Sequence, residues 1–129
     1  MMMTEGKTSP HLLLIEDDAA IRRGLQLLLQ GQGFEVHSFA NAAAALADRA
    51  SFSASHVVID YAMPHCDGIE ALGALRDAGW RGVAVLITAF FSSALRGEAM
   101  AAGFAEVLPK PFRDDILLDA LSPSRAGHA

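Results

Sequence analysis

The sequence has little of several residue types, and each shortage narrows what the chain can be. A single cysteine, Cys66, excludes an intrachain disulfide and favours a reducing, cytoplasmic location. Lysine and arginine do not cluster, and the net charge is −5, so neither nucleic acid nor an anionic membrane surface is an expected ligand. The sequence also lacks an apolar run long enough to span a membrane and the apolar stretch of a signal peptide.

Aromatic residues make up only 7% of the 129 residues, whereas 52% are hydrophobic. We therefore expect an aliphatic core of Ala, Leu, Val and Ile between a sheet and helices. The length suits one domain, which we place at residues 11–121, between flexible tails at residues 1–10 and 122–129.

Short apolar runs alternate with helical patterns along the chain. Unbroken runs at 12–15, 57–59 and 83–87 are typical of strands covered on both faces, and further strands are predicted at 34–39 and 106–108. Helices are predicted after Asp18 as far as Gly31, with Ile21, Leu25, Leu28 and Leu29 on one face, from Asn41 to about Ala50, from Asp67 to Gly79, from Ser92 or Ser93 to Ala102, and from Asp114 to Leu121. This alternation predicts an α/β fold, a parallel sheet with helices on both faces.

Polar side chains stand at the ends of these predicted strands. In doubly wound sheets, ligands bind outside the carboxyl ends of the strands. We therefore expect one shared site, to which four of the strands contribute Glu16, Asp17, Asp60, Thr88 and Lys110.

This set of side chains suits metal-assisted phosphoryl transfer. Asp17 and Asp60, with Glu16 acting directly or through water, offer the oxygen ligands that Mg²⁺ prefers. An Asp carboxylate can attack phosphorus to form an acyl phosphate, and Lys110 and Thr88 could then donate to the phosphoryl oxygens. The backbone near Ala62 could add a carbonyl to the metal, and that near Ala89 an N–H to the phosphate.

Several motifs together resemble response-regulator receiver domains of two-component signalling, of the chemotaxis-regulator type, over about residues 11–121. They are Ile15-Glu16-Asp17-Asp18, Asp60 with Met63-Pro64 and Asp67-Gly68, Thr88-Ala89, Ala102-Gly103, and Lys110-Pro111-Phe112. The resemblance implies a flavodoxin-like, doubly wound, five-stranded sheet of order 2-1-3-4-5 with five helices. It also implies Asp60 as the phosphoacceptor, Glu16 and Asp17 as the acidic pair, and a cis Lys110–Pro111 peptide.

The same resemblance implies the partners. A sensor histidine kinase or a histidine phosphotransfer protein would donate the phosphoryl group with Mg²⁺, or Mn²⁺ as a substitute. The downstream protein effector stays unidentified, and phosphorylation-linked dimerisation stays open. We expect no enzyme activity beyond self-phosphorylation at Asp60 and slow autodephosphorylation.

The sequence departs from the family pattern in three ways. Val107 stands where the last strand usually carries Tyr or Phe, so switching is expected to rest more on the Thr88 loop and the helix after it. Arg113 replaces a small capping residue, which leaves the first turn of the last helix to Asp114 and Asp115. Ala62 and Phe90 cannot orient a hydrolytic water, and the Phe90 ring is expected to shield the phosphate, which predicts slow loss of the phosphoryl group.

The sequence is also compatible with other interpretations. A receiver-like interaction module that never takes phosphate is the main alternative, and a haloacid-dehalogenase-type phosphatase is disfavoured because Ala62 stands where that family needs a second Asp. His65 and Cys66 suggest a metal or redox loop, but packing is the simpler interpretation. The remaining histidines are scattered without ligand spacing. For Phe90 and Phe91, we expect one ring to pack inward and the other to suit a partner surface. Leu95, Met100 and Leu118 could also contact a partner, but core packing is favoured.

Overall fold

A computed structural model describes residues 9–122, so the predicted tails fall almost wholly outside the described residues. Five parallel strands form one sheet in the order β2-β1-β3-β4-β5, which confirms the predicted flavodoxin-like topology. In chain order the elements are β1 (His11–Ile15), α1 (Ala19–Gly31), β2 (Glu35–Phe39), α2 (Ala42–Ala47), the 3₁₀ helix η1 (Arg49–Ser53), β3 (His56–Asp60), α3 (Gly68–Asp77), β4 (Val83–Thr88), α4 (Ser93–Ala102), β5 (Glu106–Pro109) and α5 (Asp114–Ala120).

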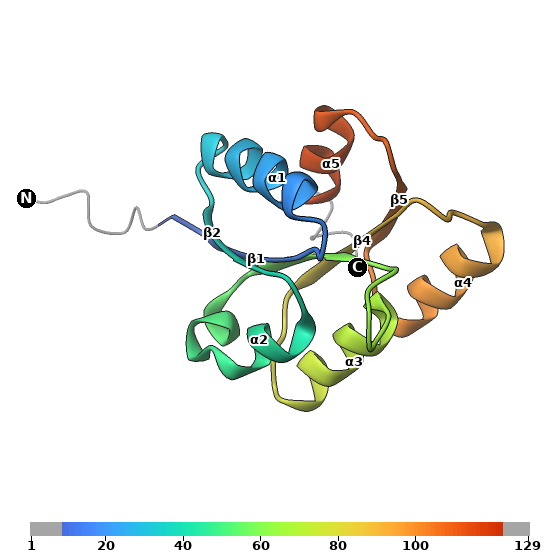
Figure 1. Ribbon diagram of the computed structural model, residues 1–129, viewed down its shortest axis with the longest axis horizontal. Coiled ribbons are helices and arrows are strands. Elements are labelled where there is room, and N and C mark those ends of the chain that lie inside the picture. The colour runs from blue at the N-terminus through green and yellow to red at the C-terminus, as the bar shows by residue number, and fades with distance from the viewer. Residues whose placement is uncertain (1–8, 123–129) are drawn as a thin grey trace, which may run out of the picture.

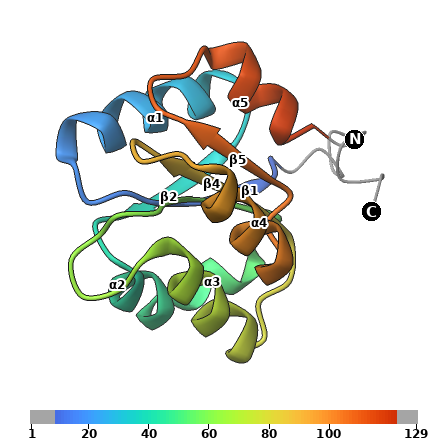
Figure 2. The same ribbon diagram turned by 90° about the vertical axis from the view of Figure 1, so that its right-hand side faces the viewer.

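The sheet lies between two helical layers, with α1 and α5 on one face and α2, α3 and α4 on the other (Figures 1 and 2). Side chains alternate across a strand, so Leu12 and Leu14 of β1 pack toward α1 and α5, whereas Leu13 and Ile15 pack toward α2 and α3. Both cores are mainly aliphatic, as expected from the composition. The unbroken apolar runs therefore identify the strands that are covered on both faces.

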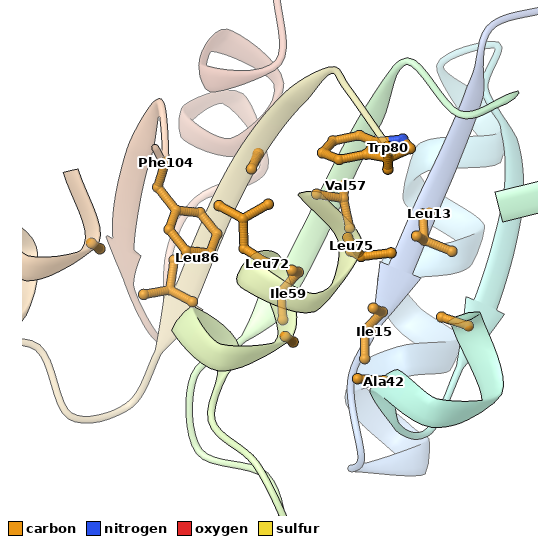
Figure 3. Packing of buried hydrophobic residues seen from close by; sticks show 14 of the residues in the cluster. Leu13, Ile15, Ala42, Val57, Ile59, Leu72, Leu75, Trp80, Leu86 and Phe104 are labelled. Carbon is orange, nitrogen blue, oxygen red and sulfur yellow. The ribbon is translucent and has the colours of Figure 1, made fainter. Parts of the chain in front are cut away.

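Trp80 is the largest fully buried side chain, although it lies in no apolar run or motif that would predict this. It is fully buried at the end of the aliphatic core beside Val57 (Figure 3). Its indole N–H donates to the Ala54 carbonyl at 2.8 Å, and the Arg76 guanidinium lies 4.8 Å from the ring centroid. The polar atom of the ring is thus satisfied, and the indole closes the connection between α3 and β4.

The predicted helix from Asn41 to about Ala50 is wrong at its end. Helix α2 stops at Ala47, Asp48 takes an extended conformation, and η1 follows. The Asp48 carboxylate accepts the Ala50 N–H at 2.9 Å, and the buried Ser51 hydroxyl donates to the Ala45 carbonyl at 2.7 Å. These side chains offer the backbone an alternative to another helical turn, which an alanine-rich pattern does not reveal.

Several helix caps predicted from the sequence are present. The side chain of Asp18 caps α1 by accepting the Ile21 N–H at 2.9 Å, and Asp67 and Glu70 form a capping box at α3. Helix α5 begins after Arg113, whose side chain makes no cap bond, and Asp114 and Asp115 occupy the first turn, as expected. Asp18 is therefore used by the fold, which leaves its neighbours Glu16 and Asp17 for the site.

Candidate functional site

The parallel register brings the predicted site residues to one edge of the sheet. Asp60 ends β3 beside Ile87 of β4, and the Lys110 N–H donates to the Thr88 carbonyl at 2.7 Å at the end of β4. Glu16 follows β1, and its N–H donates to the Phe39 carbonyl at 3.1 Å. These residues all belong to the carboxyl ends of their strands, as the sequence predicted.

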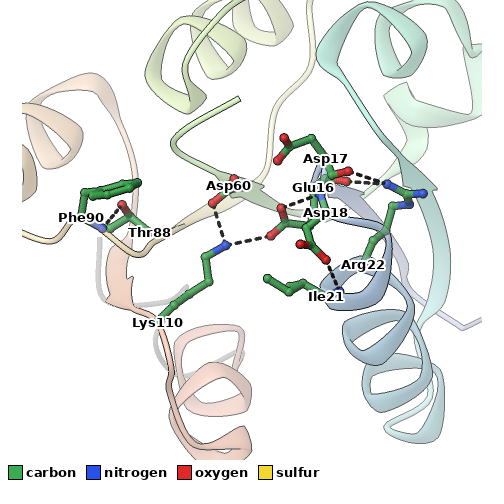
Figure 4. Close-up of polar contacts among 9 residues, drawn as sticks. All are labelled: Glu16, Asp17, Asp18, Ile21, Arg22, Asp60, Thr88, Phe90 and Lys110. Atoms are coloured by element: carbon green, nitrogen blue, oxygen red, sulfur yellow. Dashed lines mark hydrogen bonds and ion pairs between the residues drawn. The ribbon is translucent and has the colours of Figure 1, made fainter. Parts of the chain in front are cut away.

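Lys110 joins the two acidic segments directly (Figure 4). Its Nζ lies 3.0 Å from Glu16 Oε1 and 3.0 Å from Asp60 Oδ1. Carboxylate oxygens of Glu16, Asp17 and Asp60 lie within 4.8 Å of one another. Glu16 and Asp60 are buried, whereas Asp17 is exposed. The all-oxygen donor set, open to solvent at Asp17, fits Mg²⁺, which binds carboxylates and keeps several waters.

Burial sets the ionisation of this cluster. It raises the pKa of Asp60 above the ordinary value, and the ammonium of Lys110 opposes the shift. Burial likewise raises the pKa of Glu16, against the Asp18 N–H and Lys110. Burial lowers the pKa of Lys110, but its hydrogen bonds to Asp60 and Glu16 outweigh this and raise it. The folded chain thus holds excess negative charge that an arriving cation would stabilise.

The turn that carries the acidic pair is held by its own neighbours. Glu16 Oε2 accepts the Asp18 N–H at 3.1 Å, which orients the carboxylate toward Lys110. Arg22, on the first turn of α1, donates from Nη1 to the Glu16 carbonyl at 2.8 Å. Arg22 is not predicted from the sequence, because nothing in the pattern of a helix shows that an arginine on it points back to the preceding turn.

Gly68 is a second residue of the site that the sequence placed only in a motif. A Cβ at this position would lie 2.6 Å from Leu86 Cδ1 and 2.8 Å from the Asp60 carbonyl oxygen. The Gly68 N–H donates to the Tyr61 carbonyl at 2.8 Å. Helix α3 therefore begins against the backbone of Asp60, and only glycine permits this approach.

The remaining predicted residues lie around the cluster without touching it. Thr88 is fully buried, and its hydroxyl accepts the Phe90 N–H at 2.9 Å. Ala62 lies exposed in the loop after β3, and Ala89 lies exposed after β4. Within residues 9–122, neither alanine nor the Thr88 hydroxyl hydrogen-bonds the Asp60 carboxylate. Their roles stay predictions.

A cavity of about 420 Å³ adjoins Lys110, and the Lys110–Pro111 peptide is cis, as the resemblance implied. The cavity is lined by Ile21, Leu25, Ala89, Lys110, Pro111, Phe112 and Asp114. Ile21 was expected on the buried face of α1 but is 36% exposed. It lies on the first helical turn, at the cavity rim, and Leu25 and Leu29 fill the core one and two turns later.

The two adjacent phenylalanines correct another expectation. Both rings are exposed, Phe90 by 69% and Phe91 by 42%, so neither packs inward. Met100 is also exposed, so core packing is the wrong prediction for this residue, whereas Leu95 is buried and Leu118 packs against the core, as expected. Val107 lies on β5 and is buried in the core.

Cys66 packs partly buried against the core. Burial, and then the negative charge of Glu70 and Asp67, raises the pKa of its thiol. A thiol with a raised pKa is a poor nucleophile and a poor metal ligand at neutral pH. The packing interpretation of Cys66 is therefore favoured over a redox or metal role.

Sequence comparison agrees with the fold and the site. The response regulator receiver domain profile matches residues 12–122. The chain therefore belongs to the family of response regulator receiver domains, the phosphoacceptor modules of two-component signalling.

Individual relatives support the same assignment. The transcriptional regulatory protein FixJ of Bradyrhizobium diazoefficiens is 38% identical over 110 residues, which cover 85% of this chain and 54% of FixJ. The crystal structure of FixJ-N superposes with a TM-score of 0.80 at 29% identity, covering 93% of this chain and 95% of that one. The chemotaxis protein CheY4 of Vibrio cholerae gives a TM-score of 0.80 at 28% identity, over 88% and 96%.

The chain spans about half the length of the curated relatives that it matches first. What those whole regulators do is therefore not carried over to this chain by the match. In the part of the chain that the structure describes, none of the helices has the length and apolar character of a membrane span.

Proposed function

We propose that Asp60 accepts a phosphoryl group from a phosphohistidine of a sensor kinase or phosphotransfer protein. The observation that carries this proposal is the position of Lys110 Nζ, 3.0 Å from both Asp60 and Glu16, beside a third carboxylate. Glu16, Asp17, Asp60 and the Ala62 carbonyl would hold Mg²⁺, with Mn²⁺ as a substitute. When bound, the ion supplies positive charge that offsets the repulsion between carboxylates and an anionic phosphoryl group.

The transfer is a displacement at phosphorus. An oxygen of the Asp60 carboxylate attacks the phosphorus atom, the P–O bond forms as the P–N bond breaks, and the donor imidazole leaves with the bonding electrons. The Lys110 ammonium, already 3.0 Å from Oδ1, is placed to move from Asp60 to a phosphoryl oxygen. The Ala89 N–H is the proposed backbone donor to a second oxygen.

Thr88 would report the phosphate to the surface. Its hydroxyl now accepts from the Phe90 N–H, so turning toward the phosphate would release the backbone of the loop that carries the exposed Phe90 and Phe91. Val107 offers no ring that could turn in concert with Thr88. The exposed loop and the start of α4 are therefore the proposed output surface, whose effector and oligomeric consequence the chain does not specify.

We further infer slow autodephosphorylation, because Ala62 and Phe90 provide no polar group to orient water toward the acyl phosphate. The variant Ala62→Asn is expected to lose the phosphoryl group faster than wild type, since an amide at this position can hold a water. The loss is followed by intact mass after removal of the donor. A wild-type lifetime of seconds rather than minutes to hours would contradict the inference.

The central experiment is intact-mass analysis after incubation with acetyl phosphate and Mg²⁺. Wild type is expected to gain one phosphoryl adduct, Asp60→Asn none, and the exposed control Asp77→Asn one. Asp60→Asn keeps the side-chain shape, so loss of the adduct reports the missing nucleophile. A wild-type chain that gains no adduct would favour a module that acts unphosphorylated. The lone cysteine and the phosphohistidine donor agree with a cytoplasmic location.

A further inference from the structure

The histidines were expected to be scattered, and for two of them this is wrong. His11 begins β1, directly opposite Glu35 of β2 in the sheet register, and Leu13 pairs with His37. Glu35 and His37, two residues apart, project from the same face of β2 as His11 does from β1. The three side chains meet at the end of the sheet opposite Asp60, because all strands run parallel.

The distances within this cluster suit a shared cation. His11 Nε2 lies 3.3 Å from Glu35 Oε1, and His37 Nε2 lies 3.2 Å from Glu35 Oε2. One ligand atom from each of the three residues can be chosen so that all lie within 4.8 Å, and the imidazole centroids are 5.3 Å apart. Ligand atoms of a tetrahedral zinc site, with bonds of about 2.0–2.2 Å, stand about 3.3–3.6 Å apart.

His37 supplies an independent sign of a missing ligand. In the described part of the chain, its Nε2 is buried and has no hydrogen-bond partner, although the Glu35 carboxylate is near. Buried polar atoms are normally paired, and each exception calls for an explanation such as an absent ion. The orphaned atom faces the same carboxylate that His11 faces.

Ser53 holds the His11 ring with Nε2 toward the Glu35 carboxylate. The Ser53 hydroxyl donates to the Ala50 carbonyl at 2.9 Å, so toward His11 Nδ1, 3.0 Å away, it can only accept. Nδ1 therefore carries a proton, which leaves Nε2 as the ring nitrogen that faces the Glu35 carboxylate. A metal cation between Nε2 and the carboxylate would stabilise this approach, and metal-bound histidines are typically fixed by such an outer hydrogen bond.

We propose that His11, Glu35 and His37 bind one first-row transition-metal ion of the Zn²⁺ class. Two imidazoles and a carboxylate form a donor set that suits zinc, and all three side chains keep some solvent exposure, so water can fill a remaining position. The ion would join the edge strand β2 to β1 and, through Ser53, to η1. The site is separate from Asp60 and does not depend on its phosphorylation.

The test is calorimetric titration of the metal-free chain with Zn²⁺ in excess Mg²⁺. The Mg²⁺ occupies the carboxylate cluster around Asp60, so that this cluster does not bind the added Zn²⁺. Wild type is expected to bind one equivalent. His37→Gln and His11→Gln should weaken binding at least about tenfold, and Ser53→Ala about tenfold through its outer bond. His65→Asn and Glu98→Gln are matched controls at exposed positions and should bind as wild type does.

Asp17→Asn removes a carboxylate from the cluster around Asp60 and none from the proposed histidine site, so it should retain Zn²⁺ binding. Absence of binding in wild type, equal binding by His37→Gln, or loss in Asp17→Asn or His65→Asn would each overturn the proposal. Phosphorylation at Asp60 verifies the fold of the other variants, and circular dichroism verifies that of Asp17→Asn, which lacks a proposed Mg²⁺ ligand. If a histidine variant does not fold, paramagnetic Co²⁺ added to wild type decides: selective broadening of β1 and β2 amide signals supports the site, and broadening elsewhere contradicts it.

Discussion

The two ends of the sheet are built from opposite kinds of chemistry. At the carboxyl ends, three carboxylates cluster beside one ammonium, so the cluster carries excess negative charge, and two of the carboxylates, Glu16 and Asp60, are buried. At the amino end of β3, His56 Nε2 donates to the Leu121 carbonyl at 3.0 Å, and the ring stacks edge-on against Phe34. The carboxylates at the first end are left with excess negative charge, whereas at the second end the ring nitrogens of His56 are paired within the chain.

The largest effect is expected from removing the Lys110 ammonium at the carboxyl ends of the strands. Lys110→Met should slow phosphorylation by acetyl phosphate about a hundredfold or more, since a lost charge donor in a buried site typically costs this much. The rate is measured by intact mass over time. Arg113→Met removes a cation three residues away that pairs with the exposed Asp115, and it should leave the rate unchanged. Equal rates in Lys110→Met and wild type would remove Lys110 from the site.

The next effect concerns the backbone contact behind Asp60. Gly68→Ala should lower the free energy of unfolding by about 1–3 kcal/mol, because the new methyl group meets Leu86 and the Asp60 backbone. Gly73→Ala is the control on the same helix. Nothing lies within 4 Å of its Cβ, so it should stabilise the chain by about 0.5–1 kcal/mol. Urea unfolding measures the free energy of unfolding of both variants. A change of the same sign in the two would contradict the close approach of Gly68 to Leu86 and Asp60.

The two ends also differ in how far the sequence predicts them. Glu16, Asp17, Asp60 and Lys110 each sit at the end of a recognisable strand, and parallel strands deliver their ends to one edge whatever the exact register. The amino end gives no such signal. His11 meets Glu35 and His37 only through the β1–β2 register, which local patterns do not fix.

Side-chain exposure was similarly hard to predict. The exposed rings of Phe90 and Phe91 and the buried indole of Trp80 depend on how the loops after β4 and α3 run. Helix α2 ended early because Asp48 and Ser51 bonded to nearby backbone, a choice that alanine periodicity does not record. Hydrophobic patterning therefore predicts the elements and the ligand edge, and tertiary contacts decide the rest.

A smaller effect should show that the buried carboxylate of Asp60 lowers the stability of the fold. Burial raises the pKa of Asp60, so the folded state binds a proton there more readily than the unfolded state. Stability from this group therefore falls as pH rises through the raised pKa. Asp60→Asn should stabilise the chain at neutral pH by about 0.5–1 kcal/mol, as relief of a strained functional site does. Thermal unfolding should show the gain shrinking with Mg²⁺ and at acid pH, and no such gain in Asp77→Asn.

The smallest effect concerns His56, at the amino end of β3, whose stability contribution depends on pH with the opposite sign. Burial lowers the pKa of His56, and the Leu121 carbonyl only partly opposes this. The unfolded state then binds the proton more readily, so the stability contributed by neutral His56 is complete above about pH 6.5 and is lost as pH falls toward the lowered pKa. His56→Gln keeps a donor for Leu121 but cannot titrate, so its melting temperature should fall less than that of wild type between about pH 7 and about pH 5.5. His65→Asn, which replaces an exposed loop histidine, should lose as much melting temperature as wild type does. If the melting temperatures of wild type and His56→Gln fell equally with pH, His56 would not be the cause of the acid sensitivity.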